Sequence, residues 1–189
     1  MLKIFETRND MLDTLTKGLV IAELGVFKGE FSQIIFDTCQ PKELVLIDLW
    51  DGESIMSGNV DGNDVQRFDG ATLYTSVRDE FSKNKNVIIH KGYTTEVLEQ
   101  YPDNYFDAIY IDADHSYIGC KSDLEMSYLK VKNGGYIMGH DYEQNFEKSK
   151  NLYKFGVNQA VNEFCKKYNL EISMKGNDGC VSYGIKLEK

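Results

Sequence analysis

Acidic and histidine side chains gather at four points of this chain, each at the end of an apolar run or directly after it. These points are Glu23 with Gly25 and Gly29, then Asp48, then residues 112–117 (DADHSY), then residues 140–142 (HDY). Carboxylates accept hydrogen bonds, and a histidine with a pKa of about 6.5 can take up a proton at neutral pH. These residue types predict a ligand site that includes a general base.

The first two points belong to one strand–helix–strand unit. Residues 19–24 and 43–47 have the continuous apolar pattern of strands buried on both faces, and the segment between them is apolar at helical spacing. Because parallel strands end at the same edge of a sheet, Glu23, the glycine turn and Asp48 should lie together. The glycines let the backbone approach a ligand, and an acid at the second strand tip can accept from both hydroxyls of a ribose.

The spacing of the glycines decides between two classes of nucleotide cofactor. A dinucleotide site needs G-x-G-x-x-G, whereas Gly25 and Gly29 are four residues apart and Glu23 precedes them. E-x-G-x-x-x-G followed by an acid on the next strand resembles the class I S-adenosylmethionine-dependent methyltransferases. In that family the turn holds the amino acid end of the cofactor and the acid holds its ribose. The resemblance implies cofactor contacts from these residues: Glu23, Gly25, Phe27, Lys28, Gly29, Asp48 and Leu49. The alternative is that the glycines only shape a tight turn.

A third buried strand, residues 86–90 (NVIIH), ends at the turn formed by residues 91–94. In the family this turn borders the adenine of the cofactor. The resemblance therefore implies that Tyr93 offers the base an aromatic face and that Thr94 lies beside it. Tyr93 as a capping side chain of the next helix is the alternative.

Residues 106–111 and 136–139 read as the fourth and fifth strands, and they end on Asp112 and His140. Alternating strands and helices, with every polar motif at the same strand end, predict an open α/β sheet with a cleft at its carboxyl edge. With the resemblance, the expected fold is a Rossmann-like seven-stranded methyltransferase sheet. It should be mostly parallel, with a C-terminal antiparallel hairpin and helices on both faces.

The remaining segments complete this expectation. Residues 1–17 should form an amphipathic lead-in helix. Residues 49–69 read as a long loop, either a substrate lid or a surface excursion. Further helices are expected at residues 73–81, 116–131 and 156–168. Residues 170–174 and 181–187 alternate like strands around a glycine turn, which predicts the hairpin.

The two later motifs, I-D-A-D-H-S-Y and G-G-Y-I-M-G-H-D-Y, resemble those of small-molecule O-methyltransferases of the macrocin and cephalosporin-tailoring type (methyltransferase family 24 type). Members commonly hold a divalent cation between an acid at the fourth strand tip and an adjacent pair at the fifth. The resemblance implies that Asp112, His140 and Asp141 bind Mg²⁺ or Mn²⁺, although a histidine here replaces the first residue of the pair. Such a cation lowers the pKa of a bound hydroxyl and orients it. The alternatives are that His140 binds substrate and that the acids cap helices.

His115 lies three residues after Asp112 and matches the base of macrocin-type sugar methyltransferases. The resemblance implies that His115 and Asp112 carry the catalysis, with His115 taking the proton of the acceptor hydroxyl. Asp112 is also expected to contact the cofactor, and Asp114 to orient that imidazole or to contact the cofactor. A packing role for His115 is the alternative.

The composition of the chain limits the classes of function that it can have. The 189 residues, 42% of them hydrophobic, suit a single domain spanning residues 1–189. A net charge of −9, with no Lys/Arg cluster beyond residues 166–167, argues against nucleic acid as a partner. No apolar run reaches the ~20 residues of a membrane helix. Four cysteines without metal-ligand spacing, and no signal peptide, predict reduced thiols in the cytoplasm.

The sequence therefore predicts an enzyme of class EC 2.1.1.- that transfers a methyl group from S-adenosylmethionine to a hydroxyl of a small molecule. A sugar or glycosylated metabolite is the expected acceptor, with metal assistance. One alternative is a metal-independent methyltransferase in which His115 and His140 serve as base and binder. Another is a non-catalytic cofactor-binding partner subunit. A homo-oligomer is compatible with the sequence, but no stretch identifies its interface.

Overall fold

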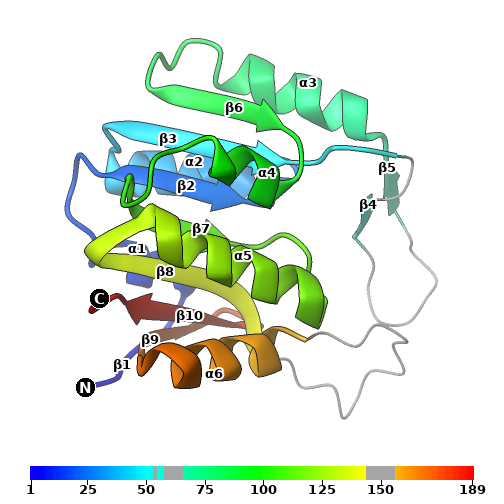
Figure 1. Cartoon of the computed structure of the whole chain (residues 1–189). Coiled ribbons are helices and arrows are strands. Elements are labelled where there is room, and N and C mark those ends of the chain that lie inside the picture. The colour runs from blue at the N-terminus through cyan, green and yellow to red at the C-terminus, as the bar shows by residue number, and fades with distance from the viewer. Residues whose placement is uncertain (53–54, 58–65, 144–155) are drawn as a thin grey trace.

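The computed structural model describes residues 1–52, 55–57, 66–143 and 156–189. Within them, one sheet of eight strands has the order β1-β9-β10-β8-β7-β2-β3-β6 (Figure 1). Its strands are β1 (Lys3–Phe5), β2 (Val20–Leu24), β3 (Glu43–Asp48), β6 (Val87–Lys91), β7 (Phe106–Ile111), β8 (Val131–Glu143), β9 (Ile172–Asn177) and β10 (Val181–Lys186). The helices are α1 (Arg8–Leu12), α2 (Glu30–Cys39), α3 (Gly70–Glu80), α4 (Thr94–Glu99), α5 (Tyr117–Lys130) and α6 (Val157–Tyr168).

The sheet is mostly parallel, as the sequence predicts. Strands β8, β7, β2, β3 and β6 run parallel to one another. Strand β10 is antiparallel to both β8 and β9, which forms the expected C-terminal hairpin. The Rossmann-like methyltransferase fold is therefore confirmed, and the carboxyl ends of the central strands share one edge.

Each face of the sheet carries its own hydrophobic core. On one face, Ile35 of α2 and Val77 of α3 are at most 1% exposed and pack with Leu44 and Leu46 of β3. On the other face, the alternate residues of the same strand pack against α4, α5 and α6, which Figure 1 shows in front of the sheet. Both faces of β3 are thus buried, and this explains why the central strands show no alternation of apolar and polar residues.

The N-terminal segment differs from the expected lead-in helix. Residues 3–5 form strand β1, which pairs in parallel with β9 and makes eight strands where seven were expected. Only Arg8–Leu12 is helical, and Thr7 and Asp10 close a capping box at its start. A three-residue strand and a five-residue helix are too short for periodicity to show, since their stability comes from tertiary contacts.

Other differences also concern short elements. The predicted loop over residues 49–69 contains an antiparallel pair, β4 (Ile55–Ser57) and β5 (Gln66–Phe68). The rest of the proposed lid, residues 53–54 and 58–65, lies outside the described residues. Helix α4 was not predicted, and β8 already begins at Val131. No helix in the described part of the chain is long and apolar enough to cross a membrane.

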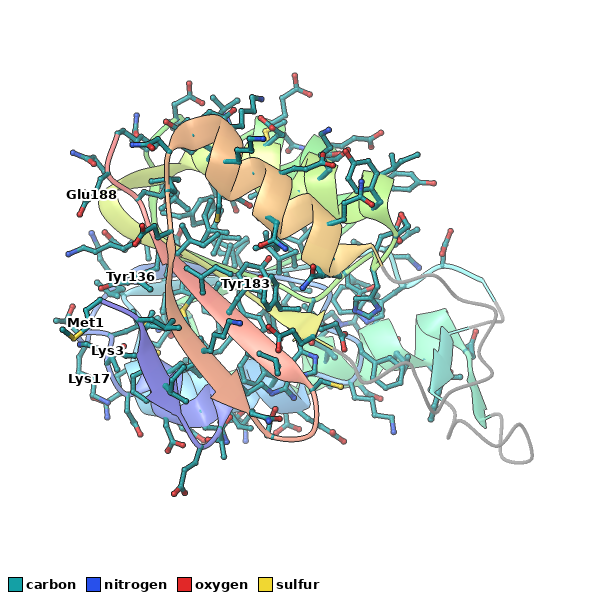
Figure 2. The ribbon with its side chains drawn as sticks, turned by 90° about the horizontal axis from the view of Figure 1, so that it is seen from below. Met1, Lys3, Lys17, Tyr136, Tyr183 and Glu188 are labelled. Atoms are coloured by element: carbon teal, nitrogen blue, oxygen red, sulfur yellow. The ribbon has the colours of Figure 1, made fainter. Side chains whose placement is uncertain are left out.

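Two tyrosines in one core differ in whether their hydroxyl groups are bonded. The Tyr183 side chain is fully buried, and within the described residues its hydroxyl has no hydrogen-bond partner. Figure 2 shows Tyr183 inside the molecule, whereas Met1 and Glu188 lie at its edge. The Tyr142 hydroxyl donates to Oδ1 of Asn162 at 2.9 Å, and the two tyrosine rings are 6.0 Å apart.

We predict that Tyr183→Phe leaves the free energy of unfolding unchanged or raises it, because the substitution removes a buried polar group that makes no bond. Tyr142→Phe, the matched control, should lower it by about 1 kcal/mol. Denaturant unfolding of both variants measures the difference. A larger loss for Tyr183→Phe than for Tyr142→Phe would contradict the prediction.

Candidate functional site

A cavity of about 890 Å³ lies at the carboxyl ends of β2, β3, β6 and β7. Its volume is in the range of roughly 300–1,000 Å³ that is usual for small-molecule sites. All the residues predicted to contact a cofactor line it except Gly29, namely Glu23, Gly25, Phe27, Lys28, Asp48, Leu49, Tyr93, Thr94, Asp112 and Asp114. The catalytic candidate His115 lines the same cavity.

Asp48, the predicted ribose acceptor, also shapes the glycine turn. Its Oδ2 accepts from the backbone N–H groups of Val26 and Phe27 at 2.7 and 2.8 Å. Its Oδ1 accepts from the N–H of Trp50 at 2.9 Å. A carboxylate has about four acceptor positions, so one remains for a ligand. Asp48 therefore combines a structural role, which the sequence did not predict, with capacity for one further hydrogen bond.

The two glycines occupy positions that other residues would strain. Gly25 has φ +86°, and a Cβ there would lie 2.0 Å from the carbonyl oxygen of Asp112. Gly29 has φ +81° and is the N-cap of α2. The tight-turn interpretation is thus supported, and it also explains how the β2 turn lies directly against the tip of β7 along the cavity wall.

Glu23 is a buried acid in the cavity wall, 1% exposed. The Ser32 hydroxyl donates a hydrogen bond to its Oε2. Burial raises the pKa of Glu23 to about 8, against the lowering effect of Ser32 and with a further increase from Asp112. Glu23 is therefore mostly protonated at neutral pH, and a cation bound beside it would favour its ionised form.

An acidic-histidine centre, defined as Asp112, His115, His140 and Asp141, adjoins the cavity, which Asp112 and His115 line. Nε2 of His115 is 3.2 Å from Oδ1 of Asp112 and 3.0 Å from Oδ2 of Asp141. Nδ1 of His140 is 3.3 Å from the same Asp141 oxygen and 3.9 Å from Asp112. The structure thus brings together both predicted catalytic residues and all three predicted metal ligands.

The geometry gives His115 a place among the candidate metal ligands. Ligand atoms of Asp112, His115 and Asp141 all lie within 4.8 Å of one another, close enough for one cation. The imidazole expected to act as a base therefore faces the same two carboxylates as a metal ion would. An imidazole nitrogen with carboxylate oxygens suits Mn²⁺, Fe²⁺ or Zn²⁺ better than Mg²⁺ or Ca²⁺.

Two charged residues of the site were not predicted. Arg8 of α1 lies 3.4 Å from Oδ2 of Asp112 and 3.3 Å from Asp178 of the β9–β10 turn, and its guanidinium packs 4.2 Å from the centre of the Phe31 ring. Asp178 lies 3.8 Å from Nε2 of His140. Neither residue stands at a strand tip of a βαβ unit, so no sequence signal marked them.

Asp114 lies just before helix α5 and lines the cavity. Its carboxylate accepts from the backbone N–H of Ser116 at 2.8 Å and from the Ser116 hydroxyl at 3.0 Å. The Ser116 hydroxyl in turn accepts from the N–H of Gly119 at 3.0 Å, which caps the helix. Tyr93 makes no side-chain capping bond to α4, and its side chain is 58% exposed at the cavity. The cap of α5 is therefore Ser116, which Asp114 supports, and the Tyr93 side chain does not cap α4.

The part of the chain that carries these motifs matches a known protein family. The methyltransferase domain family matches residues 22–142, from β2 to the acidic tip of β8. No curated protein matches the sequence.

Several solved structures share the fold. The O-methyltransferase from Bacillus cereus in complex with SAH has a TM-score of 0.64 at 16% identity, covering 95% of this chain and 80% of that chain. The O-methyltransferase NovP has a TM-score of 0.62 at 16% identity, covering 96% and 80%. The N-methyltransferase NodS from Bradyrhizobium japonicum WM9 has a TM-score of 0.64 at 12% identity, covering 96% and 95%. At these identities the likeness shows the fold alone.

The centre should make stability depend on pH. Burial by itself would lower the pKa of both imidazoles. For His115 the hydrogen bond to Asp112 and the charges of Asp141 and Asp112 outweigh burial, and for His140 the bond to Asp141 does so. Both pKa values are therefore raised. A raised histidine pKa contributes stability that is fully present below the unfolded value of about 6.5 and is lost as pH rises through the folded value.

We expect the difference in unfolding free energy between the wild type and His115→Gln to be largest near about pH 6 and to shrink towards about pH 9. Denaturant unfolding across this range measures it. Glu23 titrates in the same range in both proteins, so its contribution cancels in the difference. A difference that stays constant with pH would show that His115 gains no charge-dependent stabilisation.

Proposed function

The chain belongs to the methyltransferase domain family, and on that premise we propose that it transfers the methyl group of S-adenosylmethionine to a hydroxyl oxygen of a small molecule. One observation carries the proposal: Asp112 and His115 of the acidic-histidine centre line the same cavity as all the predicted cofactor residues except Gly29. A methyl donor held along the glycine turn and an acceptor held at His115 would therefore meet there. A non-catalytic subunit has no need of such a centre.

The cavity residues suit the three parts of the cofactor. Glu23 and the glycine turn would hold its amino acid end, where the ammonium group would favour the ionised form of Glu23. Asp48 has one acceptor position left for a ribose hydroxyl. Tyr93 and Thr94 would border the adenine. When bound, the cofactor supplies an electrophilic methyl group, whose bond to the sulfonium sulfur breaks and leaves neutral S-adenosylhomocysteine (SAH).

The residues of the chain must then accept the proton of the attacking hydroxyl. Nε2 of His115 is the proposed acceptor, and Asp112 and Asp141 stabilise the imidazolium that forms. The same carboxylates raise the pKa of His115, so a neutral imidazole there is a strong base but is less populated at low pH. Activity should therefore increase as pH rises through this pKa.

A divalent cation is the second part of the proposal. Asp112 and Asp141, with His115 or His140, would hold it, and the nitrogen and oxygen donors fit Mn²⁺ better than Mg²⁺. Such a cation would lower the pKa of the acceptor hydroxyl and orient it. The metal-free alternative keeps His115 as the base. A sugar or glycosylated acceptor is proposed from the resemblance of the DADHSY and HDY motifs to macrocin-type enzymes.

Calorimetry with SAH and NAD tests the cofactor class. We expect SAH to bind and NAD not to bind. Asp48→Ala should weaken SAH binding by about 1.5–3 kcal/mol, the value of one hydrogen bond to a charged group. Because Asp48 also supports the turn, binding must be measured where the variant is folded, with the exposed Asp37→Ala as the matched control. Tight NAD binding, or wild-type affinity in Asp48→Ala, would overturn the assignment.

Chelation separates the metal-assisted mechanism from the metal-free one. An acceptor is first identified by screening hydroxylated sugars and glycosides for the mass gain of one methyl group. If a cation assists, EDTA should abolish turnover, leave SAH binding intact, and allow Mn²⁺ to restore activity. Full activity in EDTA would favour His115 as the unaided base, and His115→Ala should then lower kcat about 10²–10⁴-fold.

A further inference from the structure

A second buried acid, outside the predicted motifs, lines the cavity. Asp123 lies in the second turn of α5 and is 2% exposed. It lies beside Thr94 of α4, at the part of the cavity that also includes Gly92, Thr95 and Ser122. Arg8, Glu23, and Asp112 and His115 of the acidic-histidine centre also line this cavity, and no role was predicted for Asp123 from the sequence.

The carboxylate of Asp123 has unused acceptor capacity. Its Oδ1 accepts from the Thr94 hydroxyl at 2.5 Å, and in the described part of the chain no cation and no other donor bonds to it. A carboxylate can accept about four hydrogen bonds, and a buried one with few partners is costly. Burial raises its pKa to about 6, despite the Thr94 bond and with help from Asp114. Asp123 is therefore mostly ionised at neutral pH and still able to accept.

The order of groups in the proposed cofactor indicates what meets Asp123. The glycine turn and Glu23 lie on one side of Asp48, and Gly92 lies on the other, donating its N–H to the carbonyl oxygen of Asp48 at 2.9 Å. A ribose at Asp48 with its amino acid end at Glu23 therefore directs the base towards Gly92 and Thr94. That base carries an exocyclic amino group, which is a hydrogen-bond donor.

Resting on the proposed function, we propose that Asp123 is a specificity-determining residue that accepts a hydrogen bond from the exocyclic amino group of the adenine ring. Hypoxanthine carries an oxygen at that position. Two acceptors would then face each other, and the site would select adenine over the deaminated base. The competing interpretation is purely structural: Asp123 only holds Thr94 and so fixes α4 against α5.

The test compares SAH with S-inosylhomocysteine, its deaminated analogue, by calorimetry. The wild type should bind SAH at least about tenfold more tightly, as one hydrogen bond to a charged group allows. Asp123→Asn should reduce this preference below about threefold or reverse it, because the amide can donate to the hypoxanthine oxygen. Glu125→Gln, on the same helix and outside the cavity lining, is the control and should keep both affinities.

Each result decides between the interpretations. A wild-type preference below about threefold overturns the inference, as does an undiminished preference in Asp123→Asn, whatever the change in absolute affinity. A purely structural role predicts that both ligands weaken by the same factor. If Asp123→Asn does not fold, Asp123→Ser and the wild-type ratio decide. Failure of SAH itself to bind the wild type would refute the proposed function, whereas SAH binding without discrimination refutes only the role of Asp123.

Discussion

The carboxylate of Asp48 holds together the two turns on which the candidate site depends. It accepts backbone N–H groups from Val26 and Phe27 after β2 and from Trp50 after β3. Phe27 and Trp50 have positive φ values of 53° and 37°, which are unfavourable for residues with side chains. The Trp50 indole closes the network by donating to the carbonyl oxygen of Phe27 at 2.9 Å. Hydrogen bonds to an ionised acceptor therefore stabilise a backbone that local preferences oppose, and this backbone forms one wall of the cavity.

The charges of the lining residues determine which ligands the cavity prefers. Seven acidic residues, one of them the mostly protonated Glu23, line it, against the two cations Arg8 and Lys28. Water is partly excluded there, so these charges act more strongly than they would at the surface. Such a cavity favours a ligand with a positive charge, as the sulfonium group of the proposed cofactor has. Beside the cavity, the carboxylates of Asp112 and Asp141 raise the pKa values of both imidazoles of the acidic-histidine centre in spite of burial.

Residues of the N-terminal and C-terminal segments meet at the acidic-histidine centre. Strand β1 pairs with β9, so that Lys3 lies opposite Met174, and α1 follows directly. This pairing places Arg8 between Asp112 of β7 and Asp178 of the β9–β10 turn. The short N-terminal elements thus place the positive charge of Arg8 beside two acidic residues of the site.

The sequence by itself determined that the central strands are buried and parallel, and at which edge the polar motifs meet. Continuous apolar runs mark strands buried on both faces, and the carboxyl ends of parallel strands share one edge, so Glu23, Asp48 and Asp112 had to converge. Only the tertiary structure decided which side chains touch. It bonded Asp48 to the glycine turn, placed His115 between Asp112 and Asp141, and brought Arg8 and Asp123 to the cavity. Local periodicity indicates which face of an element is buried. These contacts depend instead on how segments that are remote in sequence pack together, and no local pattern predicts that packing.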